Sequence, residues 1–197
     1  MYTNGFPVSD LFRENSRYTL QSGTGDLSLR QLMNESLVYI SCGQQDTDSS
    51  DFQIVTSPTS LLGEETLWVF PLYSYPETGS RQGEQQTGIR SPNLDTDIVG
   101  RITAALGLAF VPEKEDEGRV CFVGSPELRT DFRLSFAPAD ILDYIHGVLK
   151  RHSNGDSCVD LHEDGFPVIP YPENADTFWR LVILGNELRR HGGGTVK

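Results

Sequence analysis

The spacing of apolar residues changes along this chain, and that change restricts its possible folds more than any other feature. In the first two thirds, apolar residues occur in short runs rich in β-branched and aromatic side chains, bounded by Gly, Pro, Ser or Asp. In the last third they recur at the intervals of an amphipathic helix. The first pattern predicts strands and the second predicts helices. We therefore expect an α+β protein, with a mixed or antiparallel sheet followed by a helical C-terminal subdomain.

The predicted strands share short apolar runs that end at turn-forming residues, and they span residues 36–42, 52–56, 67–73 and 120–123. The third run is the most hydrophobic segment, and Pro71 within it indicates an edge strand or the end of a strand. Residues 5–24 lack a sustained period and predict an extended lead-in. Residues 26–33 predict a short helix.

Three longer helices are predicted from apolar spacing and from signals at their ends. Asp95 or Thr96 can cap the first, which ends at Gly107. The second begins near Pro138, and the third spans about 175–188. Three aromatic residues at helical spacing are predicted core residues: Tyr144, Phe178 and Trp179. We expect one compact unit with a β-rich recognition part at 1–134 and a helical subdomain at 135–197.

The charge balance is unusual for a protein that binds nucleic acid. The chain has 197 residues, with 28 acidic and 16 basic side chains, so its formal net charge is −12. A free-standing DNA-binding domain is usually basic. Much of the acidic excess lies in predicted loops, around 46–51 and 113–117. In a multidomain enzyme another domain can supply phosphate contacts while this one contacts base edges, so the charge is a weak argument against DNA.

Neither a secretory signal nor a membrane anchor is apparent in the sequence. The first residues lack a basic segment followed by an apolar one, and no apolar run approaches the roughly 20 residues that span a bilayer. We expect a cytoplasmic protein without membrane contacts. The three cysteines, Cys42, Cys121 and Cys158, lie far apart and are interpreted as free thiols.

Four segments resemble, in the same order, landmarks of one protein family. They are FPLYSYP at 70–76, RSPNL at 90–94, FAPADILDYIHGVL at 136–149, and the stretch from GFPVIPYP to LGNEL at 165–188. The chain thus resembles the C-terminal specificity region of Type ISP restriction-modification enzymes and related single-chain adenine methyltransferases, over at least 36–191. One departure is Val168, where relatives usually carry arginine.

This resemblance implies a role in recognising a specific sequence in double-stranded DNA, without catalysis by this chain. The partner would be a methyltransferase domain, either in the same polypeptide or as a separate chain. A methyltransferase needs a glycine-rich turn for S-adenosylmethionine and an Asn/Asp-Pro-Pro-Tyr/Phe motif for the flipped adenine, and this sequence has neither. The partner domain would therefore bind S-adenosylmethionine. No P-loop is present either. We expect no cofactor in this chain.

The predicted DNA contacts are side chains that can pair with base edges or phosphates. Arginine suits guanine and glutamine suits adenine, because each can form two hydrogen bonds with the base. The polar segment 77–93 contains four such candidates: Arg81, Gln85, Gln86 and Arg90. Gln44 and Gln45 form a second group after the first predicted strand. Lys150 and Arg151, at the end of a predicted helix, are candidate phosphate contacts.

Two other functions remain open at this stage. The net charge of −12 also suits an acidic protein-interaction module that imitates DNA. A small metal-dependent hydrolase would require His152, Cys158 and His162 to converge. The distribution of surface charge distinguishes DNA recognition from DNA mimicry, since a DNA-binding domain needs a basic face and a DNA mimic needs ordered carboxylates.

Overall fold

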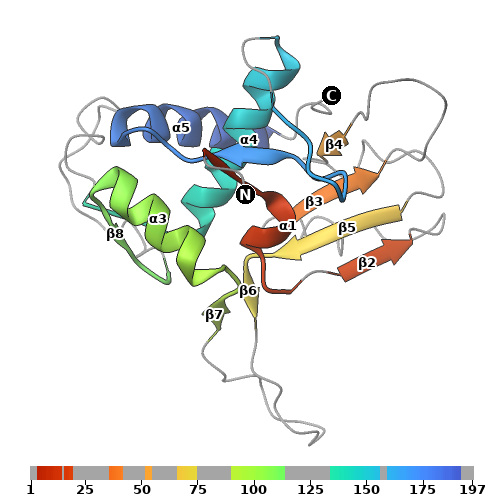
Figure 1. The fold of residues 1–197 in the computed structure, drawn as a ribbon, viewed down its shortest axis with the longest axis horizontal. Coiled ribbons are helices and arrows are strands. Elements are labelled where there is room, and N and C mark those ends of the chain that lie inside the picture. The colour runs from red at the N-terminus through yellow and green to blue at the C-terminus, as the bar shows by residue number, and fades with distance from the viewer. Residues whose placement is uncertain are drawn as a thin grey trace, which may run out of the picture.

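A four-stranded antiparallel sheet forms one side of the protein in the computed structural model (Figure 1). The structure describes residues 4–14, 16–19, 36–41, 52–54, 66–74, 90–113, 134–155 and 159–191. The sheet has the strand order β2-β5-β3-β4. Its strands are β2 (Ser16–Thr19), β5 (Thr66–Pro71), β3 (Ser36–Ser41) and β4 (Phe52–Ile54). The predicted strands at 36–42 and 52–56 are therefore confirmed.

Three short strand pairs connect segments that are distant in the sequence. β1 (Gly5–Pro7) pairs antiparallel with β10 (Val168–Pro170), and β6 (Tyr73–Ser74) pairs antiparallel with β7 (Ser91–Pro92). β8 (Ala109–Phe110) pairs parallel with β9 (Ser135–Phe136). The β1–β10 and β8–β9 pairs each join a strand from 1–134 to one from 135–197, so the two predicted parts are connected through their backbones.

Three of the four helices in the described residues correspond to the helices predicted from the sequence, and the fourth, α1 (Val8–Leu11), was not predicted. The other three are α3 (Thr96–Leu106), α4 (Pro138–Ser153) and α5 (Ala175–His191). Asp95 caps α3 by accepting hydrogen bonds from the N–H groups of Asp97 and Ile98 at 2.9 and 3.0 Å. Gly107 ends it with φ of +65°, a left-handed conformation that favours glycine. The predicted α+β class is confirmed. None of the described helices is long and apolar enough to cross a membrane.

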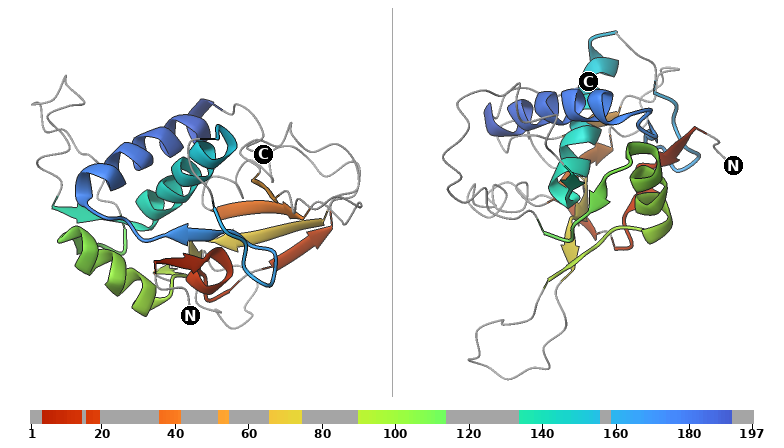
Figure 2. Two further views of the ribbon diagram at one scale, coloured as in Figure 1. Left: turned by 45° about the horizontal axis from the view of Figure 1, so that its top comes forward. Right: turned by 90° about the vertical axis from the view of Figure 1, so that its left-hand side faces the viewer.

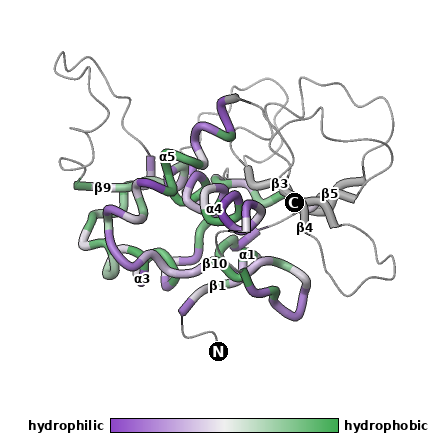
Figure 3. The backbone as a smooth tube through the Cα atoms, turned by 90° about the horizontal axis from the view of Figure 1, so that it is seen from above, coloured by the Kyte–Doolittle hydropathy of each residue, from purple (hydrophilic) through white to green (hydrophobic). Residues whose placement is uncertain are grey.

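Helix α4 lies at the centre of the hydrophobic core. Every residue from 140 to 149 is buried, and α5, α3, α1 and the β1–β10 pair surround the helix (Figures 1 and 2). Tyr144, Phe178 and Trp179 are buried as predicted. The Phe178 ring of α5 contacts both the Tyr144 ring of α4 and the Trp179 ring next to it. The outer helices show mixed green and purple in Figure 3, as expected for helices with one buried face.

Two glycines let the backbones of α4 and α5 approach very closely. A Cβ atom on Gly185 of α5 would lie 1.8 Å from the carbonyl oxygen of Asp143. A Cβ atom on Gly147 of α4 would lie 2.2 Å from the carbonyl oxygen of Leu181. Both distances are far below van der Waals contact, so no larger residue fits at either position without moving a helix.

Two sequence predictions need correction. Residues 5–24 are not simply an extended lead-in: 5–19 contain β1, the single turn α1 and β2. Apolar side chains such as Phe6 and Leu11 are buried here, and their packing holds this single helical turn against the core. A turn this short leaves no repeating helical pattern in the sequence. The strand at 67–73 is not at a sheet edge, because β5 pairs with both β2 and β3. Pro71 is its last residue, so the alternative prediction of a terminating strand holds.

Two further predicted elements, the short helix at 26–33 and the strand at 120–123, lie outside the described residues.

The helix contact predicts a strong position-dependent effect of alanine. Gly185→Ala should lower the free energy of unfolding by roughly 3 kcal/mol, the upper end for overpacking, because the new methyl group meets backbone rather than a movable side chain. Gly100→Ala in α3 is the matched control: a Cβ there has nothing within 4 Å, so alanine should stabilise the helix by about 0.5–1 kcal/mol. Urea denaturation of both variants checks this. Equal stability of the two variants would contradict the close contact.

Candidate functional site

The β6–β7 pair, called here the stem, holds together the two ends of segment 75–89, which contains three of the predicted DNA contacts. Tyr73 pairs with Pro92 and Ser74 with Ser91. The stem lies at the lower end of the molecule in Figure 1, below α3 and next to the end of β5. Within the polar segment 77–93, residues 91–92 form β7. Residues 75–89 lie outside the described parts of the chain.

Asn93, directly after the stem, joins three chain segments through its amide. The residue is 1% exposed. Its Nδ2 donates to the carbonyl oxygens of Glu14 and Pro71, both at 2.8 Å, and its Oδ1 accepts from the N–H of Glu14 at 2.9 Å. Its backbone N–H donates to the carbonyl oxygen of Leu72 at 2.8 Å. A buried amide with these bonds satisfied specifies one geometry for the base of the stem.

Arg90, directly before the stem, is held by two other parts of the protein. Its Cζ lies 4.0 Å from the centroid of the Tyr73 ring, on the opposite strand of the stem. Its Nε donates to Glu113 Oε1 at 2.9 Å, and its Nη2 pairs with the same oxygen. The side chain is 26% exposed. In this structure the guanidinium is therefore engaged with Tyr73 and Glu113.

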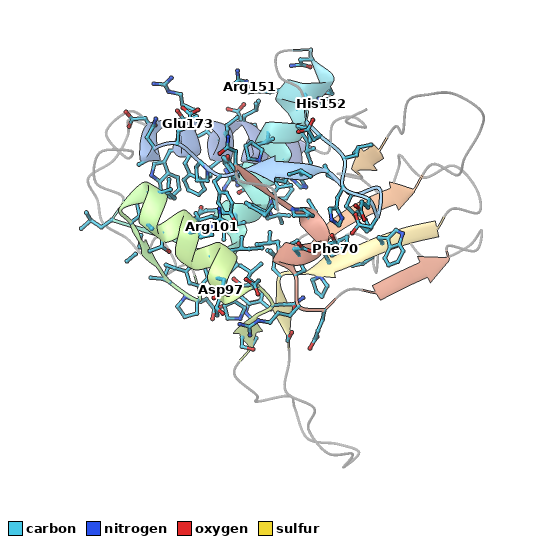
Figure 4. All side chains as sticks on the ribbon, in the orientation of Figure 1. Phe70, Asp97, Arg101, Arg151, His152 and Glu173 are labelled. Carbon is cyan, nitrogen blue, oxygen red and sulfur yellow. The ribbon has the colours of Figure 1, made fainter. Side chains whose placement is uncertain are left out.

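Lys150 and Arg151 lie in the last turn of α4, at the end of the molecule opposite the stem. Figure 4 shows Arg151 and His152 at the top, and the stem stays at the other end in the second view of Figure 2. Arg151 is exposed and Lys150 is partly exposed. Cations here also complement the negative end of the helix dipole. The structure therefore separates these two predicted contacts from Arg90 rather than forming one surface with it.

The remaining predicted DNA contacts lie outside the described residues: Arg81, Gln85, Gln86, Gln44 and Gln45.

The histidines considered for a metal site have other partners. His152 Nδ1 accepts a hydrogen bond from the N–H of Val159 at 3.1 Å. His162 Nδ1 lies 2.8 Å from Asp164 Oδ1. Burial tends to raise the pKa of Asp164, but the neighbouring Ser9 and His162 side chains and the Phe166 N–H, which donates to Asp164 Oδ1 at 3.1 Å, lower it overall. Cys158 lies outside the described residues, and within the described ranges no three His, Cys, Asp or Glu side chains are placed to hold a metal.

A buried ion pair connects α4 to α5. Asp143 accepts from Arg189 through both carboxylate oxygens, at 2.7 and 3.0 Å, and from Asn186 Nδ2 at 2.9 Å. His146, one turn along α4, is fully buried, and its ring nitrogens have no hydrogen-bond partner among the described residues. Burial first, and then the charge of Arg189, lower the pKa of His146 to about 3. The imidazole is therefore neutral in the folded protein at pH 7.

The sequence matches a known family along most of its length. A family model described as the Type ISP C-terminal specificity domain matches residues 27–191. The chain belongs to this family. The resemblance drawn from the four sequence segments is thus confirmed. A search of curated proteins and a search of solved structures each found no match for this specificity domain.

The segments that carry the family resemblance lie at structural positions rather than on one exposed surface. FPLYSYP supplies the end of β5 and the strand β6, and RSPNL supplies Arg90, β7 and Asn93. Val168, the departure noted in the sequence, is buried in β10 opposite Pro7. This position therefore contributes to the core in this chain.

Sequence reasoning missed the roles of Asn93, Tyr73 and Glu113. Glu14 lies 79 residues from Asn93, and Glu113 lies 23 residues from Arg90, so no local period connects them. The available signal was the position of Asn93 directly after Pro92, inside a segment shared with the family. An asparagine there, next to a short strand, suits a side chain that bonds to the backbone.

Removing the amide of Asn93 should destabilise the base of the stem. Asn93→Ala leaves the carbonyl oxygens of Glu14 and Pro71 and the N–H of Glu14 without this partner, which should lower the free energy of unfolding by about 2–4 kcal/mol. Asn174→Ala, which removes an exposed helix cap from α5, should cost only about 1 kcal/mol. Urea denaturation measures both. A loss at Asn93 no larger than that at Asn174 would contradict the assigned role.

His146 should make stability depend on acidity. In the unfolded chain its pKa is about 6.5, whereas the folded value is about 3. Between these values the unfolded chain binds a proton and the folded chain does not, so stability is lost as pH falls below 6.5, by up to about 1.4 kcal/mol per pH unit. His146→Leu should weaken this dependence. Unfolding free energies of both proteins between pH 7 and pH 4 check it, and parallel curves would contradict it.

Proposed function

We propose that this specificity domain recognises a short sequence in double-stranded DNA for a restriction-modification enzyme. The observation that carries the proposal is the family match over residues 27–191. In this proposal a methyltransferase domain, in the same polypeptide or a separate one, binds S-adenosylmethionine and performs the reaction. The specificity domain selects the site and has no catalytic role.

The arrangement around the stem supports a role in recognition. Side chains that contact bases must be held at a defined position, and segments that bind ligands are often presented by a rigid scaffold. The stem brings both ends of segment 75–89 together, and Asn93 bonds its base to the N-terminal segment and to the end of β5. Arg81, Gln85 and Gln86 are the proposed base contacts within that segment, and Gln44 and Gln45 are proposed as a second group.

Phosphate contact is proposed for Lys150 and Arg151. Their place at the end of α4, away from the stem, suits a backbone contact that orients the domain rather than one that selects sequence (Figure 4). Both side chains extend from a helix whose preceding turns are buried, so the core fixes the backbone from which they extend.

The charge of the described residues is compatible with this proposal. Of the 28 acidic and 16 basic residues of the chain, 13 and 9 lie in the described parts, which leaves these parts with a net charge of −4 rather than −12. Several of their carboxylates have structural partners: Asp95 caps α3, Asp140 accepts from the N–H of Ala137, and Asp143 pairs with Arg189. These groups are not available to imitate DNA phosphates.

Two classes of variant should weaken DNA binding in different ways. Arg151→Ala should reduce the slope of log affinity against log salt concentration by about 1, and the effect should be the same for every DNA sequence. Arg81→Ala should lower affinity for the preferred sequence by about 1–3 kcal/mol and relax its selectivity, because a base contact is lost. Arg180→Ala, an exposed arginine on α5 with the same charge change, is the matched control.

A preferred duplex is first enriched from a random pool by binding to the chain. Fluorescence anisotropy then measures the affinity of each variant for this duplex and for the unselected pool, at two salt concentrations. Failure to enrich any sequence, together with no binding at low salt, would contradict the proposal and favour an acidic protein-interaction module instead.

A further inference from the structure

Arg90 has a place in the structure that differs from that of the other predicted DNA contacts. It immediately precedes β7, contacts the Tyr73 ring from β6, and pairs with Glu113, three residues after the end of β8. One guanidinium therefore links both strands of the stem to a third part of the protein. Lys150 and Arg151, by comparison, extend from the end of a single helix.

The contact with Tyr73 restricts Arg90 more than the ion pair does. An ion pair as exposed as this one contributes little, since the Glu113 side chain is 57% exposed. The Tyr73 ring, however, is buried, and the guanidinium lies over it with a separation of 4.0 Å. If Arg90 moved to contact DNA, the ring would lose both its cover and a favourable cation–π contact. This cost opposes a role as a mobile contact.

We propose that Arg90 is a positioning residue for DNA recognition, which acts through Tyr73 and Glu113 to fix the orientation of the stem and does not contact DNA. The inference rests on the proposed function and assigns this one arginine a different part in it. Glu113 then belongs to the determinants of specificity, although it carries the same sign of charge as DNA.

The two possible roles of Arg90 predict opposite effects of Glu113→Gln. If Arg90 positions the stem, neutralising Glu113 loosens the stem and lowers selectivity. If Arg90 contacts DNA and Glu113 merely occupies it in the free protein, the same change releases the arginine and raises affinity. Glu113 is exposed, so we expect the variant to retain the fold. Glu187→Gln, an exposed glutamate on α5, has the same charge change and serves as the control.

The experiment is a double-mutant cycle with Arg90→Ala, Glu113→Gln and the combined variant, measured on the enriched duplex and on the unselected pool. We expect Arg90→Ala to lower the ratio of the two affinities by about three- to tenfold, and Glu113→Gln to lower it by about twofold, because the exposed ion pair contributes less than the contact with Tyr73. The combined variant should lose no more than Arg90→Ala alone, because both changes remove one interaction. The slope of log affinity against log salt should stay unchanged, since no phosphate contact is lost. Glu187→Gln should match the parent protein.

Three results would overturn the inference. They are a rise in affinity for Glu113→Gln, a reduction of the salt slope by about 1 for Arg90→Ala, or an unchanged affinity ratio in both single variants. The first two would make Arg90 a direct DNA contact while leaving the proposed function intact.

Amide hydrogen exchange without DNA tests the positioning effect separately from the proposed function. Arg90→Ala and Glu113→Gln should speed exchange at Asn93, whose N–H donates to the carbonyl oxygen of Leu72, and leave α5 unchanged. Unchanged exchange at Asn93 would overturn the positioning role. If the parent protein selects no DNA sequence, the proposed function fails, and the role of Arg90 in recognition fails with it. Faster exchange at Asn93 in the two variants would still show that Arg90 holds the stem.

Discussion

The backbone contact between α4 and α5 is the constraint on which the rest of the structure depends. Gly147 and Gly185 allow each helix to meet a carbonyl group of the other, and at that separation the intervening space admits no side chain. Asp143 lies at the same crossing, so its carboxylate reaches Arg189 and Asn186 without leaving the interface. A buried ion pair of this kind adds little net stability, but it penalises any other register of the two helices. The remaining elements pack around a helix pair whose geometry is already fixed.

The stem depends on this core through a short sequence of contacts. The apolar side chains of α1 and of the residues around it pack in the core. Two backbone contacts then connect this segment to the residues after the stem. The Asp95 N–H donates to the carbonyl oxygen of Leu11, and Phe12 forms an antiparallel β-bridge with Leu94. Asn93 adds the side-chain bonds to Glu14 and Pro71. A pair of two-residue strands would have little stability alone. Here it takes its position from segments that the core has already ordered.

The sequence predicted what local chemistry determines and missed what distant contacts determine. Asp95, Gly107 and Pro138 mark helix ends by their own conformational preferences, so the bounds of α3 and the start of α4 followed from them. The central position of β5 did not follow, because it depends on β2, whose sequence has no sustained alternation. The same holds for the site. Arg90 was found by its side-chain type, but its contacts with Tyr73 and Glu113 depend on a fold that brings three segments together. Residue type alone cannot distinguish an arginine that contacts a ligand from one that holds the scaffold.

This distinction matters for an acidic protein that is proposed to bind DNA. With a net charge of −12, long-range attraction does not favour the approach of a polyanion, so selectivity has to come from a few side chains held in a fixed geometry. Holding a side chain in place requires partners, and some of those partners are themselves acidic, as Glu113 is for Arg90. Part of the negative charge therefore serves to fix cations and helix ends rather than to face a ligand. On this view the acidic composition and the proposed role in DNA recognition are compatible, because carboxylates such as Asp143 and Glu113 have partners within the fold.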